Sequence, residues 1–537
     1  MKYLKKIIFC SVLVGALSAG CNKKSLTDLN IDPQSLPQIN LNFIFSTLEL
    51  SIAAGGGSGD NRYIDWRTNI GLTSMAIQQI ANAGGGIAPG DKYTDNPESY
   101  NAPWEHLYGS DVKNATTILR ESGTGGFAEG QYKNMRQATR IIRAFTFGRL
   151  TDYYGSVPYS EAGQAQDGIF FPHYDKQKDI IKDLLKELDE ATAAFGAADP
   201  ADGLAAADMI YQGDVTKWKK WGYSLMLRYA MRLAEVDAAT ANTYVAKAVA
   251  GGVFSANSDN ALVPMAIGPS QWTDQNGISR AFYPGDGGQP TFMSKTLIDW
   301  LKGTDASVTS DDDPRLMILT GGIGIWSPTG WSPTNTDPLQ QKGMPNGKDI
   351  TMLQILEGNP NLNTDATYSK INPKLLDLDE KYMLMNYGET QLLLAEAAQR
   401  GIGGLTAAAA PGYYAAGVKA SMQMYNVYDP SLVVTDAQVA AYLVTYPYGV
   451  SKPALQMIGE QYWVNHFLNW WEAWSNWRRT NLPALTPVDY PGNVTNGTIP
   501  QRLKYQTNEV AGNPNYGSGS TVPDTYTTKV WWAGGPE

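Results

Sequence analysis

An almost entirely apolar helical pattern runs through residues 455–480, LQMIGEQYWVNHFLNWWEAWSNWRRT. Large aromatic residues recur at steps of four and three, which places them along one side of a helix: Trp463, Phe467, Trp470, Trp474 and Trp477. A second apolar line lies beside the first and leaves a single narrow polar strip. The pattern therefore predicts one continuous, buried helix that acts as the central packing element, with Ser451 as its cap.

Amphipathic patterns predict further helices along much of the remaining chain, and Asp214 is expected to cap one of them. The predicted helices are 41–53, 61–82, 102–121, 128–154, 174–195, 215–236, 238–250, 379–400, 408–425 and 435–445. Several are adjacent pairs with short joints, as in helical-hairpin arrays of the tetratricopeptide kind. The predicted fold class is mainly α, with tetratricopeptide-like helix pairs that form a superhelical scaffold carrying long irregular, ligand-facing loops.

Residues 251–373 differ in character, because they are irregular and rich in Gly, Pro, Asp and Asn. A long irregular insertion within a compact body is usually either functional or disordered. Its large aromatic residues include Trp272, Tyr283, Trp300, Trp326 and Trp331. The aromatic content argues against disorder, so we predict a functional insertion.

The first residues have the pattern of an export signal. Three lysines precede 11 mostly apolar residues, 7–17, a run too short to span a membrane. Small residues then lead to Cys21, the position at which a bacterial lipoprotein is lipidated. We therefore predict a signal peptide at 1–20, a lipidated tether at 21–40 and a single α-rich domain at 41–537. Ordinary secretion with a free Cys21 thiol is the alternative.

Composition excludes several classes of function. Removal of the signal takes the net charge from −10 to −13, which argues against a nucleic-acid partner. Three widely separated histidines and one remaining cysteine provide no zinc-ligand spacing, and we expect no cofactor. Residues 311–313 are consecutive aspartates, for which a solvated acidic turn is favoured over a structural calcium site because regular ligand spacing is missing.

Catalytic signals are weak. The chain has no G-x-S-x-G elbow, and among its 52 acidic residues no carboxylate pair stands out for glycoside cleavage. A surface glycan hydrolase therefore stays open only as an alternative. A helical-repeat scaffold that binds protein partners alone is a further one.

The features that indicate a ligand-binding function are aromatic residues. Residues 326–333 repeat a Trp-Ser-Pro unit in a segment where proline forbids helix. In an extended chain its two tryptophans would lie up to about 15 Å apart, as exposed platforms for sugar rings. Alternatively, each ring pins the loop to the body. The predicted ligand-binding residues are Trp326, Trp331, Trp272, Tyr283, Trp66 and Tyr93.

Several separated stretches together resemble one family, the SusD/RagB-like outer-membrane nutrient-binding lipoproteins, in particular the SusD-like branch. The matching stretches are Leu29-Asn30-Ile31-Asp32-Pro33, residues 144–159 (AFTFGRLTDYYGSVPY), Asp313-Pro314-Arg315-Leu316, residues 387–398, residues 472–480 (EAWSNWRRT) and residues 500–532. Their order along the chain is that of the family.

The resemblance implies a lipid-anchored binding protein on the outer face of the outer membrane. Such a protein caps a SusC-like TonB-dependent transporter and delivers oligosaccharides or, in some members, oligopeptides; members are not enzymes. The matching motifs are packing motifs, so the resemblance assigns no ligand residue. Low charge and many Trp and Tyr residues favour sugar over peptide.

Overall fold

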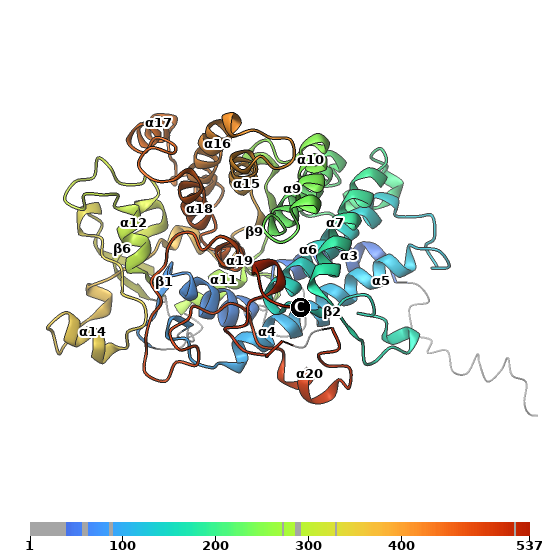
Figure 1. Cartoon of the computed structure of the whole chain (residues 1–537), viewed down its shortest axis with the longest axis horizontal. Coiled ribbons are helices and arrows are strands. Elements are labelled where there is room, and N and C mark those ends of the chain that lie inside the picture. Colours follow the sequence, from blue (N-terminus) through green and yellow to red (C-terminus); the bar gives the residue numbers. More distant parts are fainter. Residues whose placement is uncertain are drawn as a thin grey trace, which may run out of the picture. The chain divides into compact units, whose positions relative to one another are not determined.

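The computed structural model describes residues 39–55, 63–84, 90–270, 273–284, 291–327, 330–519 and 522–537. Residues Asn42–Glu537 form one compact unit (Figure 1). Within the described ranges, every helix is too short or too polar to cross a membrane.

Consecutive helices in this unit pack side by side. The pairs are α6 (Lys133–Tyr154) with α7 (Gln177–Ala194), α9 (Val215–Arg232) with α10 (Ala238–Gly251), and α15 (Tyr387–Arg400) with α16 (Ala410–Gln423). Contacts of α9 with both α7 and α15 join one pair to the next (Figure 1). The prediction of a mainly α fold built from tetratricopeptide-like pairs is confirmed. Asp214 caps α9 as predicted, accepting from the backbone N–H groups of Thr216 at 2.9 Å and Lys217 at 3.1 Å.

Shorter helices complete the unit. They are α3 (Leu41–Ile52), the π-helix η1 (Ile64–Ser74), α4 (Pro97–His106), the π-helix η3 (Leu107–Val112), α5 (Lys113–Glu121), α8 (Leu204–Ala207), α11 (Gly277–Phe282), α12 (Lys295–Leu301), α13 (Leu316–Leu319), α14 (Ile350–Leu356), α17 (Asp436–Thr445) and α20 (Thr507–Gly512).

The predicted central helix is two helices, α18 (Ala454–Asn465) and α19 (Trp470–Thr480). The chain turns between them, where Leu468 has a φ of 77°, a conformation that no helix interior allows. Ser451 does not cap α18, because the first helical turn follows Pro453 and has no side-chain cap. The burial prediction is confirmed, since all five tryptophan and phenylalanine rings of the stripe are at least 94% buried. The expected polar strip is buried as well.

Residues 251–373 contribute four of the five strands of a small antiparallel sheet, which the sequence did not predict. Its strand order is β1-β5-β8-β6-β7. The strands are β1 (Ile80–Ala81), β5 (Phe292–Met293), β8 (Ser369–Ile371), β6 (Thr320–Ser327) and β7 (Gly330–Asn335). Two further strand pairs are β2 (Val157–Pro158) with β3 (Tyr174–Asp175) and β4 (Ala261–Val263) with β9 (Tyr382–Met385). Residues 379–386 are consequently not helical, and α15 begins only at Tyr387.

Glu380, which precedes β9, gives a prediction about pH. Burial, together with the negative charges of Asp377 and Asp379, raises the pKa of Glu380 to about 8. Since the folded chain then binds a proton that the unfolded chain has released, this group lowers stability as pH rises from about 4.5 to about 8. Glu380→Gln is expected to flatten the pH dependence and to raise the melting temperature more at pH 8.5 than at pH 5. Melting curves of both proteins at the two pH values test this, and parallel pH profiles would contradict it.

Candidate ligand-binding site

Trp326 and Trp331 lie directly opposite each other in the β6–β7 hairpin. Side chains of cross-strand partners project from the same face of a sheet, so the two rings share one face. Both residues are half-buried, whereas the neighbouring Ile325 is 48% exposed. The expected extended segment with rings up to about 15 Å apart is therefore wrong: the chain folds back and brings the two tryptophans together.

A second aromatic group lies where α11 packs against η1. Tyr283 directly follows α11, and the Arg280 guanidinium is 5.6 Å from the centre of its ring. In η1 the Trp66 ring is 6.2 Å from that of Tyr63, over which the Arg67 guanidinium lies at 3.9 Å. Tyr283 and Trp66 are both half-buried. Neighbouring elements thus bring two of the predicted residues to one region of the surface.

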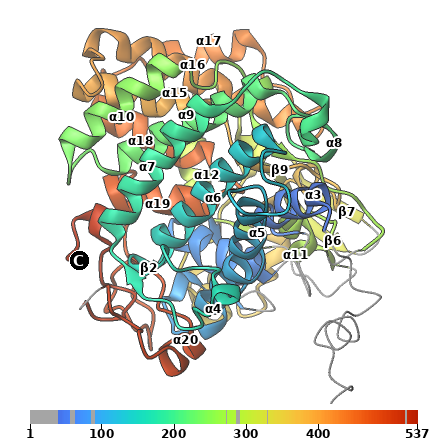
Figure 2. The same cartoon turned by 90° about the vertical axis from the view of Figure 1, so that its right-hand side faces the viewer.

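Figure 2 shows α11 and the β6–β7 hairpin on the same side of the unit. The remaining two predicted residues do not add to this surface. Trp272 lies outside the described residues. Tyr93 is only 2% exposed, and burial raises the pKa of its hydroxyl to about 12. The exposure expected for Tyr93 is not found. The segment around Val494 lies next to it, and the Val494 N–H donates to the Tyr93 carbonyl at 2.9 Å.

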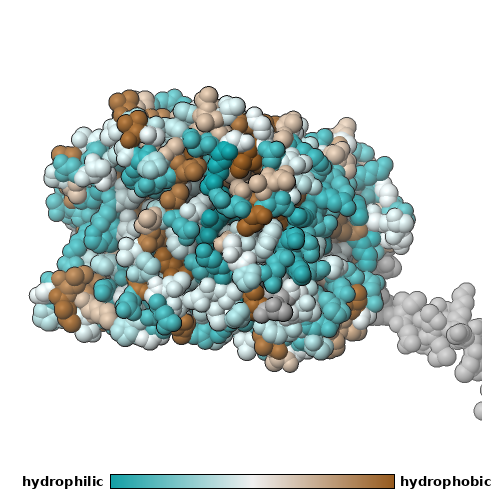
Figure 3. Space-filling model, in the orientation of Figure 1, coloured by the Kyte–Doolittle hydropathy of each residue, from teal (hydrophilic) through white to brown (hydrophobic). Residues whose placement is uncertain are grey.

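The face of the unit that is seen in Figure 3 is mainly polar. On the face drawn in Figure 3, hydrophobic residues form small, separated patches. The most exposed apolar side chains include Ile355 and Leu356 of α14 and Val444 of α17. The face in Figure 3 thus presents isolated apolar groups among polar ones.

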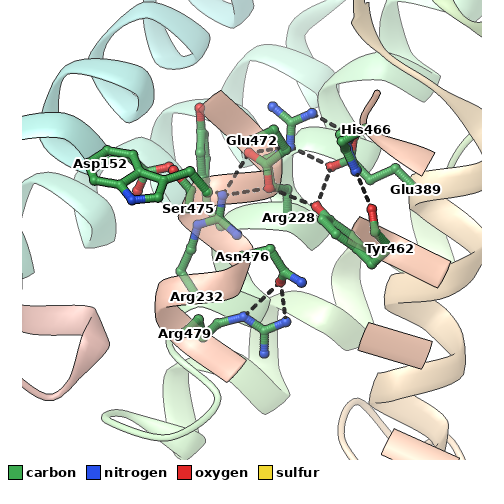
Figure 4. Close-up of polar contacts among 12 residues, drawn as sticks. Asp152, Arg228, Arg232, Glu389, Tyr462, His466, Glu472, Ser475, Asn476 and Arg479 are labelled. Carbon is green, nitrogen blue, oxygen red and sulfur yellow. Dashed lines mark hydrogen bonds and ion pairs between the residues drawn. The ribbon is translucent and has the colours of Figure 1, made fainter. Parts of the chain in front are cut away.

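Two glutamates come close together in the core, and we consider whether they could be the two carboxylates of a glycoside hydrolase. Glu389 of α15 and Glu472 of α19 are both fully buried (Figure 4). Arg228 donates to Glu389 at 2.5 and 2.7 Å, and its Nε lies 3.6 Å from Glu472. Although burial acts in the opposite direction, the Arg228 charge lowers the pKa of Glu389. Two arginine-paired carboxylates without solvent access hold helices together and cannot reach a glycosidic oxygen.

The same buried network continues into α9, α6 and α18. Arg232 donates to both Glu472 oxygens at 2.6 and 2.7 Å and to Asp152 at 3.3 Å. The Tyr462 hydroxyl donates to Glu472 at 2.7 Å, and the His466 ring lies 3.1 Å from Glu389 (Figure 4). The sequence pattern of residues 455–480 placed Glu472 in the narrow polar strip and did not predict this network. The four-residue spacing of Arg228 and Arg232, on a helix with many apolar neighbours, was the available signal.

Two of the three aspartates in the acidic turn at 311–313 form hydrogen bonds with other residues of the chain. Asp311 accepts from the Thr304 N–H at 2.8 Å and the Thr304 hydroxyl at 2.9 Å. Asp313 is bound by the buried guanidinium of Arg315 at 2.6 and 2.9 Å. In the part of the chain that the structure describes, no three His, Cys, Asp or Glu side chains meet in a way that could hold a metal ion.

Comparisons with known proteins agree with this architecture. The SusD-like family model described as "Starch-binding associating with outer membrane" matches residues 65–506. A search of curated proteins gave no match. Among solved structures, a chitin-binding protein is 30% identical with a TM-score of 0.75, covering 92% of this chain and 100% of its own. A Bacteroidetes SusD-like protein, AC2a, is 25% identical with a TM-score of 0.76 and the same coverage.

A chitin-binding SusD homologue from Flavobacterium johnsoniae shares the fold at 23% identity, with a TM-score of 0.70 over 92% of this chain and 98% of that one. The family model covers most of the chain, and the alignments with the chitin-binding protein and with AC2a cover 92% of this chain and the full length of both. The chain therefore belongs to the SusD-like family.

Proposed function

We propose that this protein binds oligosaccharides at the cell surface and delivers them to a SusC-like TonB-dependent transporter in the outer membrane. The observation that carries the proposal is the Trp326–Trp331 pair, two half-buried rings on one face of a hairpin. A flat ring beside polar groups offers an apolar surface to a sugar ring and leaves the sugar hydroxyls free to form hydrogen bonds. The family description names starch, and two relatives are named as chitin-binding.

Anchoring through a lipid on Cys21 fits this role, because a tethered protein stays next to the transporter that it serves. Cys21 lies outside the described residues, so this part of the proposal rests on the sequence and on the family's association with the outer membrane. Labelling of intact cells with a radioactive fatty acid should mark the parent protein but not Cys21→Ser.

The binding proposal predicts the behaviour of one double variant. Trp326→Ala/Trp331→Ala is expected to weaken oligosaccharide binding at least tenfold, because burying even part of two aromatic rings stabilises a complex by more than about 1.4 kcal/mol. A glycan and peptide array of the chain from residue 22 onward identifies the ligand, and calorimetry then gives the affinities.

Ile325→Ala is the matched control, since Ile325 neighbours Trp326 on the same strand but points to the opposite face and is exposed. Its affinity should equal that of the parent. Binding that is unchanged in the double variant would refute this site. Hits confined to peptides would favour the oligopeptide-binding alternative, and release of new reducing ends by the purified protein would favour a hydrolase.

A further inference from the structure

A hollow of about 400 Å³ lies where the loop after α12 meets α16, α17 and α18, and none of the aromatic residues of the candidate site lines it. Its aromatic lining consists of Trp300, Tyr414, Tyr442 and Tyr446. A neighbouring hollow of about 500 Å³ shares Tyr442 and Tyr446 with it. Each volume is in the range of small-molecule sites in proteins.

The rings of this hollow are held in place by contacts with the body. The Trp300 Nε1–H donates to Glu460 at 3.0 Å, and its ring meets Trp463 edge to face at 6.1 Å. The Tyr446 hydroxyl donates to the Asp311 carbonyl at 2.9 Å. Trp300 and Tyr446 are nevertheless only half-buried. Rings that are already fixed before binding lose little conformational entropy when a ligand covers them.

The charges of the lining select against anions. Carboxylates of Asp299, Asp311 and Glu460 border the hollow. Lys452 pairs with Glu460 at 2.6 Å, and Lys295 and Arg315 likewise pair with Asp299 and Asp313 of the lining. The Asp311 carboxylate therefore leaves the lining with a net negative charge. An acidic sugar would meet this lining with like charge, whereas hydroxyl or ammonium groups can donate to it.

We propose that this hollow is a second saccharide site, which takes a neutral or amine-bearing sugar and rejects uronic acids. This proposal rests on the proposed function, because the second site would bind another part of the same kind of saccharide. Two sites on one rigid unit engage one polymer together, so a long chain binds more tightly than a short one without any new contact.

Ser451→Trp tests the site. Ser451 lines the hollow and is exposed, so a large side chain there fills the space without disturbing the core. The matched control is Val450→Trp, because Val450 is 76% exposed and lies outside the lining. Calorimetry uses the N-acetylglucosamine tetramer of chitin and maltoheptaose as probes, with trigalacturonate as the acidic probe.

For the neutral probe that binds, we expect two molecules per parent chain and per Val450→Trp chain, but one per Ser451→Trp chain. Trp326→Ala/Trp331→Ala is also expected to bind one, and that remaining site should not bind trigalacturonate. One molecule per parent chain, lost in the double variant, would overturn the second site and leave the proposed function intact. Two molecules per Ser451→Trp chain, or trigalacturonate bound by the double variant, would also overturn it. Binding of neither neutral probe to the parent would count against both proposals.

Ala441→Trp in the neighbouring hollow keeps the test decisive if Ser451→Trp does not fold. Ala441 is exposed and lines that hollow, while the adjacent Ala440 is exposed on the same helix outside the lining. Ala441→Trp is expected to lower the affinity of the second site at least threefold relative to Ala440→Trp, because the two hollows adjoin at Tyr442 and Tyr446. Equal affinities would overturn the site.

Discussion

Replacing Glu472 with glutamine is expected to lower the free energy of unfolding by about 3–5 kcal/mol. The substitution keeps the size of the side chain but removes the charge to which Arg232 donates two hydrogen bonds. Arg232 is fully buried, and Asp152 at 3.3 Å is a more distant partner. A buried guanidinium that has lost its main counter-charge cannot recover that interaction from water. Urea denaturation followed by circular dichroism measures the difference.

A surface ion pair in the same protein provides the control. Glu235 pairs with Arg400 at 2.6 Å, but its side chain is 56% exposed. Water and salt screen such pairs, so Glu235→Gln should cost less than about 1 kcal/mol. If the two substitutions destabilised the protein equally, burial of the Glu472 network would not be the source of its contribution.

Gly148→Ala is expected to destabilise the protein by about 1–3 kcal/mol, although alanine is the better helix former. Gly148 lies where α6 crosses α9, and a Cβ built on it would overlap the ring of Tyr229. That ring has little freedom to move, because it is 1% exposed and its hydroxyl donates to the carbonyls of Ala144 and Phe145 at 3.2 and 3.3 Å. Thermal unfolding should show the loss as a lower melting temperature.

Gly412, a glycine on another helix, provides the control for Gly148→Ala. It is exposed on α16, and a Cβ there would meet no atom within 4 Å. Gly412→Ala should therefore raise stability by up to about 1 kcal/mol through helix propensity alone. A Gly148→Ala protein as stable as the Gly412→Ala protein would show that Tyr229 moves aside freely.

Most long helices could be predicted from the sequence, because their apolar periodicity directly reflects burial on one side. The same signal concealed the break between α18 and α19. Residues on both sides of Leu468 are buried, so the apolar pattern continues through a turn that contains neither glycine nor proline. Apolar periodicity predicts which residues are buried, but it cannot predict the backbone φ angle of a single residue such as Leu468.

The small sheet was missed for a different reason. Its strands are two to eight residues long. Apart from the β6–β7 hairpin, paired strands are far apart in sequence, as with Phe292 and Lys370. Pairing at that separation leaves no local pattern. The candidate site was only partly predictable for a related reason. The repeated Trp-Ser-Pro unit singled out Trp326 and Trp331, but their alignment across a hairpin depends on a register that the unit does not reveal.

The buried network also bears on the order in which the protein can be completed during synthesis. Arg232 leaves the ribosome 240 residues before Glu472. Until α19 has been made, the first helix pairs can form only with this arginine still hydrated or held by Asp152 alone. A chain that stops before residue 470 thus lacks the counter-charge for Arg232, so the core can close only once α19 is present.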